Sequence, residues 1–332
     1  MNNDFLKKLC AINGTSGDEN AVRDIILDEI NGFIDSHSID TLGNLIAHKK
    51  GPGKKIMLAG HMDQIGLIVT YISEEGFLYF SKVGGCFPRY CLGQRFVFSN
   101  GIIGVVAEER LDDADAAKAP SFDKMYLDIG AKNGEEAKNQ VKVGDVCVFA
   151  NKPAISGNVL ISPALDDRIG CFIMIEALKK ISSPKYDMYF VFTVQEEVGC
   201  RGAKTAAFAI DPDYGLSFDI TISADTPKAF KFPSKMYGGA AIKLKDASLL
   251  CHPIIINHLE KCAKEAGINH QFEILERGGT DSGAIHVTRD GVPSGAISVA
   301  TRYVHSANEM CALSDIEDSI NLTVKVLETA IG

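Results

Sequence analysis

An alternation of helical and strand patterns that is interrupted once limits the possible folds of this chain most strongly. Apolar residues recur at helical spacing within residues 16–30, and the apolar run at residues 56–59 is short enough to fit a buried strand. The alternation returns after residue 159. Between the two parts, residues 67–158 carry short β-rich stretches separated by turns, including the hairpin signal Asn100-Gly101. The chain is therefore predicted to be an α/β protein with an all-β insertion.

The two outer segments, residues 1–66 and 159–332, are expected to form one domain. Helices that alternate with strands predict a mixed, mostly parallel sheet flanked by helices. Ser16 and Glu19 match a capping box at the start of the first predicted helix. A second predicted helix follows Asp167, and its apolar residues mark one face for burial.

Composition excludes several classes of protein. The chain has 332 residues, of which 46% are hydrophobic, so a sizeable core is expected. Its net charge of -9, without a run of basic residues, argues against binding of nucleic acid or of an anionic membrane. The N-terminus lacks a signal-peptide pattern and no stretch is long and apolar enough for a membrane span, so a cytoplasmic location is expected. The nine cysteines lack CxxC spacing and are expected to be reduced core residues.

Acidic residues and histidines gather where strands are predicted to end, as expected for a functional site on an open α/β sheet. These residues are His61, Asp63, Asp166, Asp167, Glu196, Glu197, Asp219 and His305. Each one alone has a structural explanation. A histidine beside a strand is usually a satisfied core or surface residue, two aspartates before a helix complement its dipole, and two adjacent glutamates usually lie in a solvated loop.

Together, these residues predict a metal site. Burying several unpaired carboxylates would cost several kcal/mol each, so a cation is expected among them. Imidazole and carboxylate ligands suit zinc, cobalt or manganese better than calcium. Two histidines and three carboxylates could hold two ions if one aspartate bridges them. Because adjacent residues in an extended chain point in different directions, Glu197 could face a metal while Glu196 acts as a general base.

Six motifs resemble those of a known family when they are read in chain order. They are HMD, ALDDR, QEEVGCRGA, SFDITISAD, GGTDSGAIH and RYVHS. The ordered set, from about residue 10 to the C-terminus, is similar to the glutamyl, deblocking or tetrahedral aminopeptidases, which are cocatalytic dinuclear metallo-aminopeptidases. The resemblance implies that His61 and Asp219 bind one of two divalent ions and that Glu197 and His305 bind the other.

The resemblance also implies roles for the remaining site residues. Asp166 would bridge the two ions, and its peptide bond to Asp167 would be cis. Glu196 would be the general base, and Asp63 would orient His61. The inserted segment, residues 67–158, would be a dimerisation domain within homo-oligomers that range from dimers to tetrahedral dodecamers. Two positions depart from the family pattern, because Gln64 replaces a usual Glu and Ala300 a usual Pro.

The sequence therefore predicts a metal-dependent aminopeptidase that hydrolyses the N-terminal peptide bond of peptides, with zinc or cobalt, or alternatively manganese, as its metal. One alternative is an endoglucanase-like glycoside hydrolase, because paired carboxylates can act as acid and nucleophile. That function leaves His61 and His305 without a task, and the chain has no tryptophan to stack on sugars. A second alternative is a non-catalytic relative, although every predicted ligand position is intact.

Overall fold

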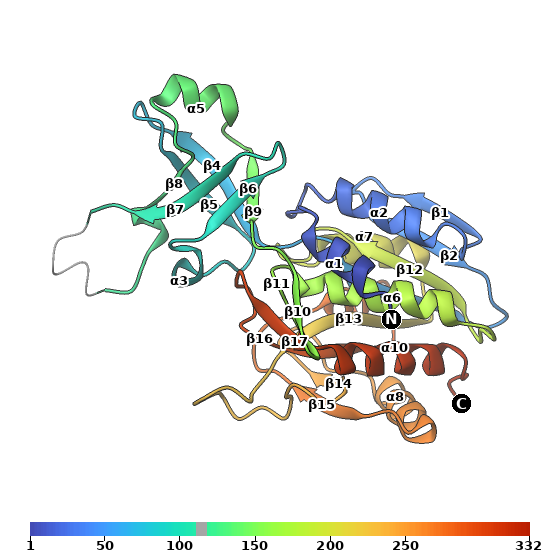
Figure 1. Ribbon diagram of the computed structural model, residues 1–332. Coiled ribbons are helices and arrows are strands. Elements are labelled where there is room, and N and C mark those ends of the chain that lie inside the picture. Colours follow the sequence, from blue (N-terminus) through green and yellow to red (C-terminus); the bar gives the residue numbers. More distant parts are fainter. Residues whose placement is uncertain (111–117) are drawn as a thin grey trace.

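The chain folds into a large α/β body and a small β-barrel that projects from it (Figure 1). The computed structural model describes residues 1–110 and 118–332. Residues 111–117, which fall within the predicted insertion at 67–158, lie outside the described part of the chain. The mixed α/β fold with a separate all-β unit agrees with the architecture predicted from the sequence.

The body is built on one mixed sheet, which has 11 strands within the described residues. The four central strands, β12, β3, β13 and β16, are parallel to one another, whereas the strands on both sides of them pair mainly antiparallel. The main order is β1 (Ser36–Ile39), β2 (Leu45–Lys49), β12 (Asp187–Thr193), β3 (Lys55–His61), β13 (Tyr214–Ile222), β16 (Ser294–Arg302), β17 (Glu309–Ala312), β11 (Val159–Ser162) and β10 (Ala154–Ser156). A branch adds β14 (Ala240–Lys245), which pairs with β16 and with β15 (His270–Ile274).

Helices cover both faces of this sheet, which explains why its central strands are almost continuously apolar. One face is covered by α6 (Leu165–Lys180), which packs on β3 and β13, and by α1 (Asn3–Ala11), α2 (Asn20–Ile30), α8 (Pro253–Ala266) and α10 (Leu313–Leu327). The opposite face is covered by α7 (Arg201–Ile210) and α9 (Asp281–Ile285). The parallel strands consequently end together at one edge of the body.

Helix α6 is buried on all sides, not on the single face predicted from its apolar spacing. Every residue from Leu165 to Leu178 is buried. The reason is that α6 lies between the sheet and the helices α1, α2 and α10. A helix in that position has no solvent-facing side, so the polar face that periodicity predicts does not exist.

The capping box predicted at Ser16 and Glu19 is absent, and α2 begins later than expected, at Asn20. The Ser16 hydroxyl donates to Asp63 at 2.6 Å and does not cap the helix. The Glu19 carboxylate accepts from the backbone N–H groups of Gly17 at 2.8 Å and Gln195 at 3.1 Å. Both side chains are used for long-range contacts, which a local sequence pattern does not reveal.

Most of the inserted β-rich segment forms a closed antiparallel barrel around an apolar core, but its last strand, β10, pairs with β11 in the sheet of the body. Its strands, in order around the barrel, are β4 (Gly66–Ile72), β5 (Leu78–Val83), β8 (Met125–Asp128), β7 (Ile103–Glu108), β6 (Arg95–Phe98) and β9 (Val146–Phe149), with the short helices α3 (Pro88–Cys91), η1 (Phe122–Lys124) and α5 (Gly134–Gln140) attached. The predicted hairpin at Asn100-Gly101 is confirmed, because β6 and β7 pair antiparallel across it and Gly101 has a φ of 87°. Inside, the rings of Phe96 and Phe149 lie 4.6 Å apart.

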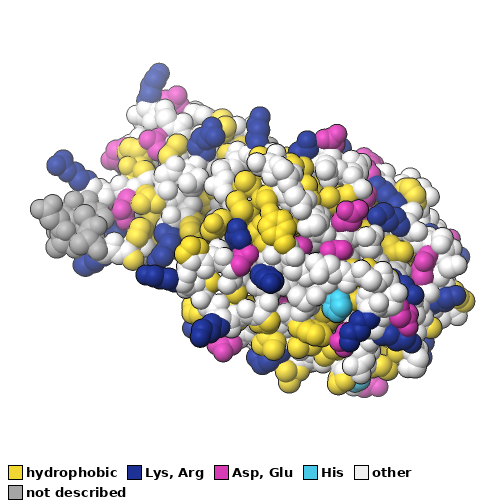
Figure 2. Space-filling model, turned by 60° about the horizontal axis from the view of Figure 1, so that its bottom comes forward, with side chains coloured by type: hydrophobic (Ala, Val, Ile, Leu, Met, Phe, Trp, Pro, Cys, Tyr) yellow, Lys and Arg dark blue, Asp and Glu magenta, His cyan; other side chains and the backbone are white. Residues whose placement is uncertain are grey.

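The charged side chains of the surface are mixed in sign (Figure 2), and the cysteines are unpaired. Basic and acidic side chains are interspersed on the face shown in Figure 2, where no extended patch of one sign is seen among the described residues. All nine cysteines, each within the described residues, are free, and all but Cys200 are buried. Among residues 1–110 and 118–332, no helix combines the length and the apolar character needed to cross a membrane. The cytoplasmic location stays a prediction.

Arg168 connects three segments of the body although it is completely buried. Its guanidinium donates to the carbonyl oxygens of Leu9 at 2.7 Å, Ile12 at 3.0 Å and Met62 at 2.9 Å. A fourth bond, of 3.0 Å, reaches the side-chain oxygen of Gln64. The cation is therefore held mainly by backbone dipoles, and it fixes α1 and the loop after β3 against α6.

We expect that Arg168→Met lowers the free energy of unfolding by about 3 kcal/mol, because it leaves several buried carbonyl groups without donors. Urea unfolding followed by circular dichroism would measure this loss. The control is Arg95→Met, which removes an exposed guanidinium from the barrel. An Arg168→Met protein as stable as that control would show that water replaces the guanidinium without cost.

Candidate metal centre

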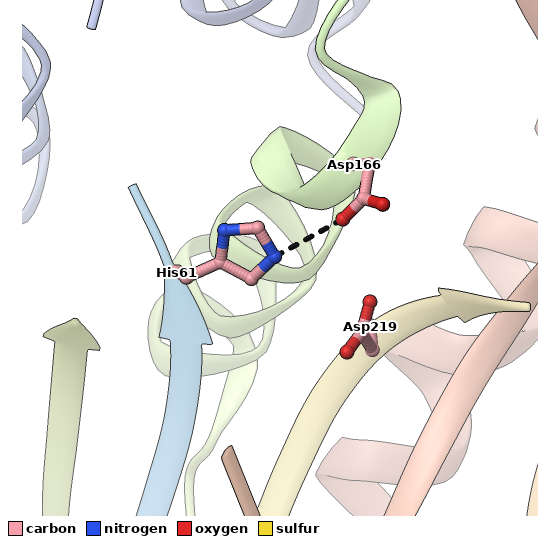
Figure 3. Close-up of side chains that lie close together, drawn as sticks. All are labelled: His61, Asp166 and Asp219. Atoms are coloured by element: carbon pink, nitrogen blue, oxygen red, sulfur yellow. Dashed lines mark hydrogen bonds and ion pairs between the residues drawn. The ribbon is translucent and has the colours of Figure 1, made fainter. Parts of the chain in front are cut away.

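The site lies at the edge of the body where the parallel strands end, and five chain segments contribute to it. His61 ends β3, Asp219 lies in β13 and Asp166 stands at the start of α6, and these three side chains point toward one another in Figure 3. The glutamates Glu196 and Glu197 follow β12, and His305 follows β16. These acidic residues and His305 line a cavity of about 390 Å³, whose other walls include glycines, Cys200 and Ile220.

Asp166 lies between the two imidazoles. Its Oδ1 is 3.0 Å from His61 Nε2, the contact drawn in Figure 3, and its Oδ2 is 3.2 Å from His305 Nε2. The peptide bond between Asp166 and Asp167 is cis, as the family resemblance implies. One carboxylate thus faces both histidines with a different oxygen atom.

Backbone carbonyls hold both imidazoles through the nitrogen that points away from the centre. His61 Nδ1 is 3.0 Å from the carbonyl oxygen of Asp63, and His305 Nδ1 is 3.0 Å from that of Gly85 in the barrel. A carbonyl can only accept, so each Nδ1 carries a proton, and Nε2 is the nitrogen of each ring that faces the centre and is available to a metal ion. A side chain at position 85 would place its Cβ 2.5 Å from the His305 ring, so this contact requires glycine.

The Asp63 carboxylate holds the glutamate pair in place. Its oxygens accept from the backbone N–H groups of Glu196 at 3.0 Å and Glu197 at 3.2 Å, and from the Ser16 hydroxyl. The Asp63 Oδ1 atom is 3.5 Å from His61 Nδ1, whereas the Asp63 carbonyl oxygen is 3.0 Å from that nitrogen. Asp63 therefore contacts His61 through its backbone and the two glutamates through its side chain.

Three buried acids that the sequence analysis left without a role also belong to this region. Glu309 accepts from the backbone N–H groups of His305 at 2.7 Å and Asp166 at 3.2 Å. Asp167 accepts from the backbone N–H of His61 at 3.2 Å. Asp281 accepts from the Thr193 hydroxyl. Asp167 and Asp281 stood within the quoted motifs, whereas no sequence pattern pointed to Glu309.

The charges of the site depend strongly on one another. Burial and the Asp166 charge raise the pKa of Asp219 to about 8. Burial alone would lower the pKa of His305, but contacts with Asp166 and Glu197 outweigh it and raise that pKa to about 12. Burial also raises the pKa of Glu196 well above its usual range, which the nearby His61 only partly offsets. The acids of this pocket cannot all be ionised unless further positive charge is present.

Comparison with known proteins identifies the family. The model for M42 glutamyl aminopeptidases matches residues 43–322. The chain belongs to this M42 family of metal-dependent aminopeptidases. It is 50% identical over 325 residues to a protein named "Putative aminopeptidase" from Acetivibrio thermocellus, and the match covers 98% of each chain. The resemblance noted in the sequence is thereby confirmed.

Solved structures show the same fold over nearly the full length of this M42 chain. Aminopeptidase APDkam598 from the archaeon Desulfurococcus kamchatkensis has a TM-score of 0.95 at 35% identity, covering 98% of this chain and 94% of its own. The TET1 peptidase of Pyrococcus horikoshii, which can assemble into a tetrahedron or a large octahedral shell, has a TM-score of 0.87 at 33% identity, covering 98% of both chains.

The donor atoms of this M42 site fit divalent cations. Two sets of side chains that share Asp166 have their ligand atoms within 4.8 Å of one another. They are His61, Asp166 and Asp219, and Asp166, Glu197 and His305. Glu197 Oε1 is buried and accepts no hydrogen bond, so it has a free coordination site 3.5 Å from His305 Nε2. Imidazole nitrogens with carboxylate oxygens are the donors that zinc, cobalt and manganese accept.

Glu309→Gln should lower the affinity of the M42 enzyme for its metal by about 10- to 100-fold, as is usual for residues that orient ligands. Glutamine has one acceptor oxygen, so the N–H of either Asp166 or His305 loses its partner. The measurement is the metal content after dialysis against a graded chelator series. Glu260→Gln, on the surface of α8, is the matched control. Equal metal retention in the two variants would contradict a positioning role for Glu309.

Proposed function

We propose that the protein removes single N-terminal residues from peptides and that two divalent ions, zinc or cobalt or alternatively manganese, are its cofactors. His61 and Asp219 would hold one ion, Glu197 and His305 the other, and Asp166 would bridge them. The observation that carries this proposal is the position of Asp166, whose two oxygens lie 3.0 and 3.2 Å from the Nε2 atoms of the two histidines. When bound, the ions would polarise the scissile carbonyl, activate water and bind the free α-amino group of the substrate.

Glu196 is proposed as the general base. Its Oε2 lies 3.8 Å from His61 Nε2, so the carboxylate faces the centre without lying between the two histidines. Burial raises its pKa well above the usual range, which makes the carboxylate a better proton acceptor. Glu196 would take a proton from the attacking water and transfer it to the leaving amine. Asp63, which binds the backbone N–H of Glu196, would keep this carboxylate in place.

The alternatives derived from the sequence explain less of the site. A glycoside hydrolase has no use for two imidazoles whose Nε2 atoms face one carboxylate, and the family is one of peptidases. A non-catalytic relative would not need a free carboxylate beside the two ligand sets. Aminopeptidase activity uses all of these groups.

Homo-oligomers, from dimers to tetrahedral dodecamers, are proposed on two grounds. The similar TET1 peptidase of Pyrococcus horikoshii can assemble into a tetrahedron or a large octahedral shell. In this chain, the outer face of β7 exposes Ile103 by 51% and Val105 by 42%, and symmetric association would cover these apolar side chains. The inserted segment, residues 67–158, is therefore the proposed dimerisation domain.

Changing each glutamate of the pair to glutamine should impair the enzyme in two different ways. Glu196→Gln keeps the shape but cannot accept a proton, so kcat on chromogenic aminoacyl substrates should fall by about 100-fold or more with unchanged metal content. Glu197→Gln weakens a ligand, so metal content should fall and excess zinc, cobalt or manganese should restore part of the activity. Full activity of Glu196→Gln, or loss of metal from that variant alone, would reverse or refute these roles.

The double variant Ile103→Glu and Val105→Glu should dissociate the assembly, because four charges would meet across each two-fold contact. Sedimentation velocity of the metal-loaded proteins should show the wild type larger than a monomer and the variant shifted toward the monomer. Phe208→Glu, which changes an apolar side chain that is 60% exposed on α7, should keep at least the dimer. A monomeric wild type at micromolar concentration would exclude the oligomer.

A further inference from the structure

We infer that the pocket holds a third metal site, formed by Glu196, Cys200 and Asp281, and that zinc bound there inhibits the enzyme. One ligand atom from each of these residues lies within 4.8 Å of the other two. The site shares no residue with the two sets that meet at Asp166. The existence of the site rests on geometry alone, whereas its inhibitory effect rests on the role proposed for Glu196.

Asp281 provides the first indication of a missing cation. This residue, at the start of α9, is only 2% exposed. The Thr193 hydroxyl donates to its Oδ2 at 2.5 Å, but its Oδ1 is buried and has no hydrogen-bond partner. Buried carboxylate oxygens are nearly always paired, so an unpaired one beside other possible ligands indicates a bound ion.

Cys200 provides the second indication of a missing cation. It precedes α7, lines the cavity and is the one cysteine of the chain that is not buried. Its Sγ lies 3.1 Å from Glu196 Oε1. Zinc binds thiolate sulfur at about 2.3 Å and carboxylate oxygen at about 2.0 to 2.2 Å, so ligand atoms roughly 3 to 4 Å apart can share one ion. A thiolate among the donors favours zinc or cadmium over manganese.

The position of Glu196 explains why this ion would inhibit. Its carboxylate faces Cys200 with Oε1 and the His61 side of the centre with Oε2. A cation held by Oε1, by the thiolate and by Asp281 would withdraw electron density from the whole carboxylate, which could then no longer accept the proton of the attacking water. Binding releases the Cys200 thiol proton to solvent and changes no oxidation state. Because zinc must displace the Cys200 thiol proton and its hydrogen bond to Glu196 Oε1, this set should fill only after the two sets at Asp166.

The test is a zinc titration of enzyme already loaded with two equivalents of zinc, comparing the wild type with Cys200→Ala and Cys200→Ser. The wild type should bind a third equivalent and lose activity. In both Cys200 variants, the zinc concentration for half-inhibition should rise at least about tenfold, with each protein normalised to its own activity at two equivalents. Cys262→Ala, which removes a buried thiol from α8, should behave as wild type.

Cadmium supplies a readout that does not depend on activity. As the third ion, it should give the ultraviolet charge-transfer band of a cadmium–thiolate bond in the wild type and in Cys262→Ala, but not in the Cys200 variants. The inference is overturned if the wild type binds no third ion, or if the Cys200 variants bind it equally well or keep the band. A chain inactive on aminoacyl substrates at every metal content would refute the proposed function, while metal stoichiometry and the cadmium band would still decide the site.

Discussion

Electrostatic repulsion among buried carboxylates is the constraint on which the rest of this structure depends. Asp166, Glu196, Glu197 and Asp219 line one cavity at the end of the parallel strands. Two imidazoles are the nearest compensating groups, and they do not suffice, because the pKa of Asp219 still rises to about 8. The fold can hold all of these acids together in their ionised form at neutral pH only if cations share the space. The stability of this arrangement and the binding of cations therefore depend on each other.

Two further carboxylates hold this arrangement without facing the centre. Asp63 binds the backbone N–H groups of Glu196 and Glu197, and Glu309 binds those of Asp166 and His305. Asp63 therefore fixes the two adjacent glutamates, and Glu309 joins the start of α6 to the loop that follows β16. Hydrogen bonds from N–H groups to a charged acceptor are stronger than neutral ones. The loops at the strand ends are ordered through their backbones, which leaves the side chains of the centre free for ligands.

The sequence predicts the fold class and most residues of the centre, because both follow from local signals. Short apolar runs that end near His61 or Glu196 mark strand ends, and parallel strand ends meet at one edge, whereas Asp219 interrupts the apolar run of β13. The failures have a common physical cause. Ser16 and Glu19 resemble a helix cap, yet their partners, Asp63 and Gln195, are distant in the chain. Glu309 lies in no motif, because it accepts hydrogen bonds from Asp166 and His305, whose segments meet only in the folded chain. Long-range hydrogen bonds of this kind leave no periodicity in a sequence.

The connection between barrel and body has an evolutionary consequence. Strands β4 and β9, through which the chain enters and leaves the barrel, pair with each other, so their ends lie side by side. Such a junction allows a domain to be gained or exchanged without rebuilding the host. Yet Gly85, inside the inserted segment, accepts the Nδ1 proton of His305. Loss of the barrel would therefore also remove the carbonyl that fixes the tautomer of His305, so the body and the insertion depend on each other for the geometry of the centre.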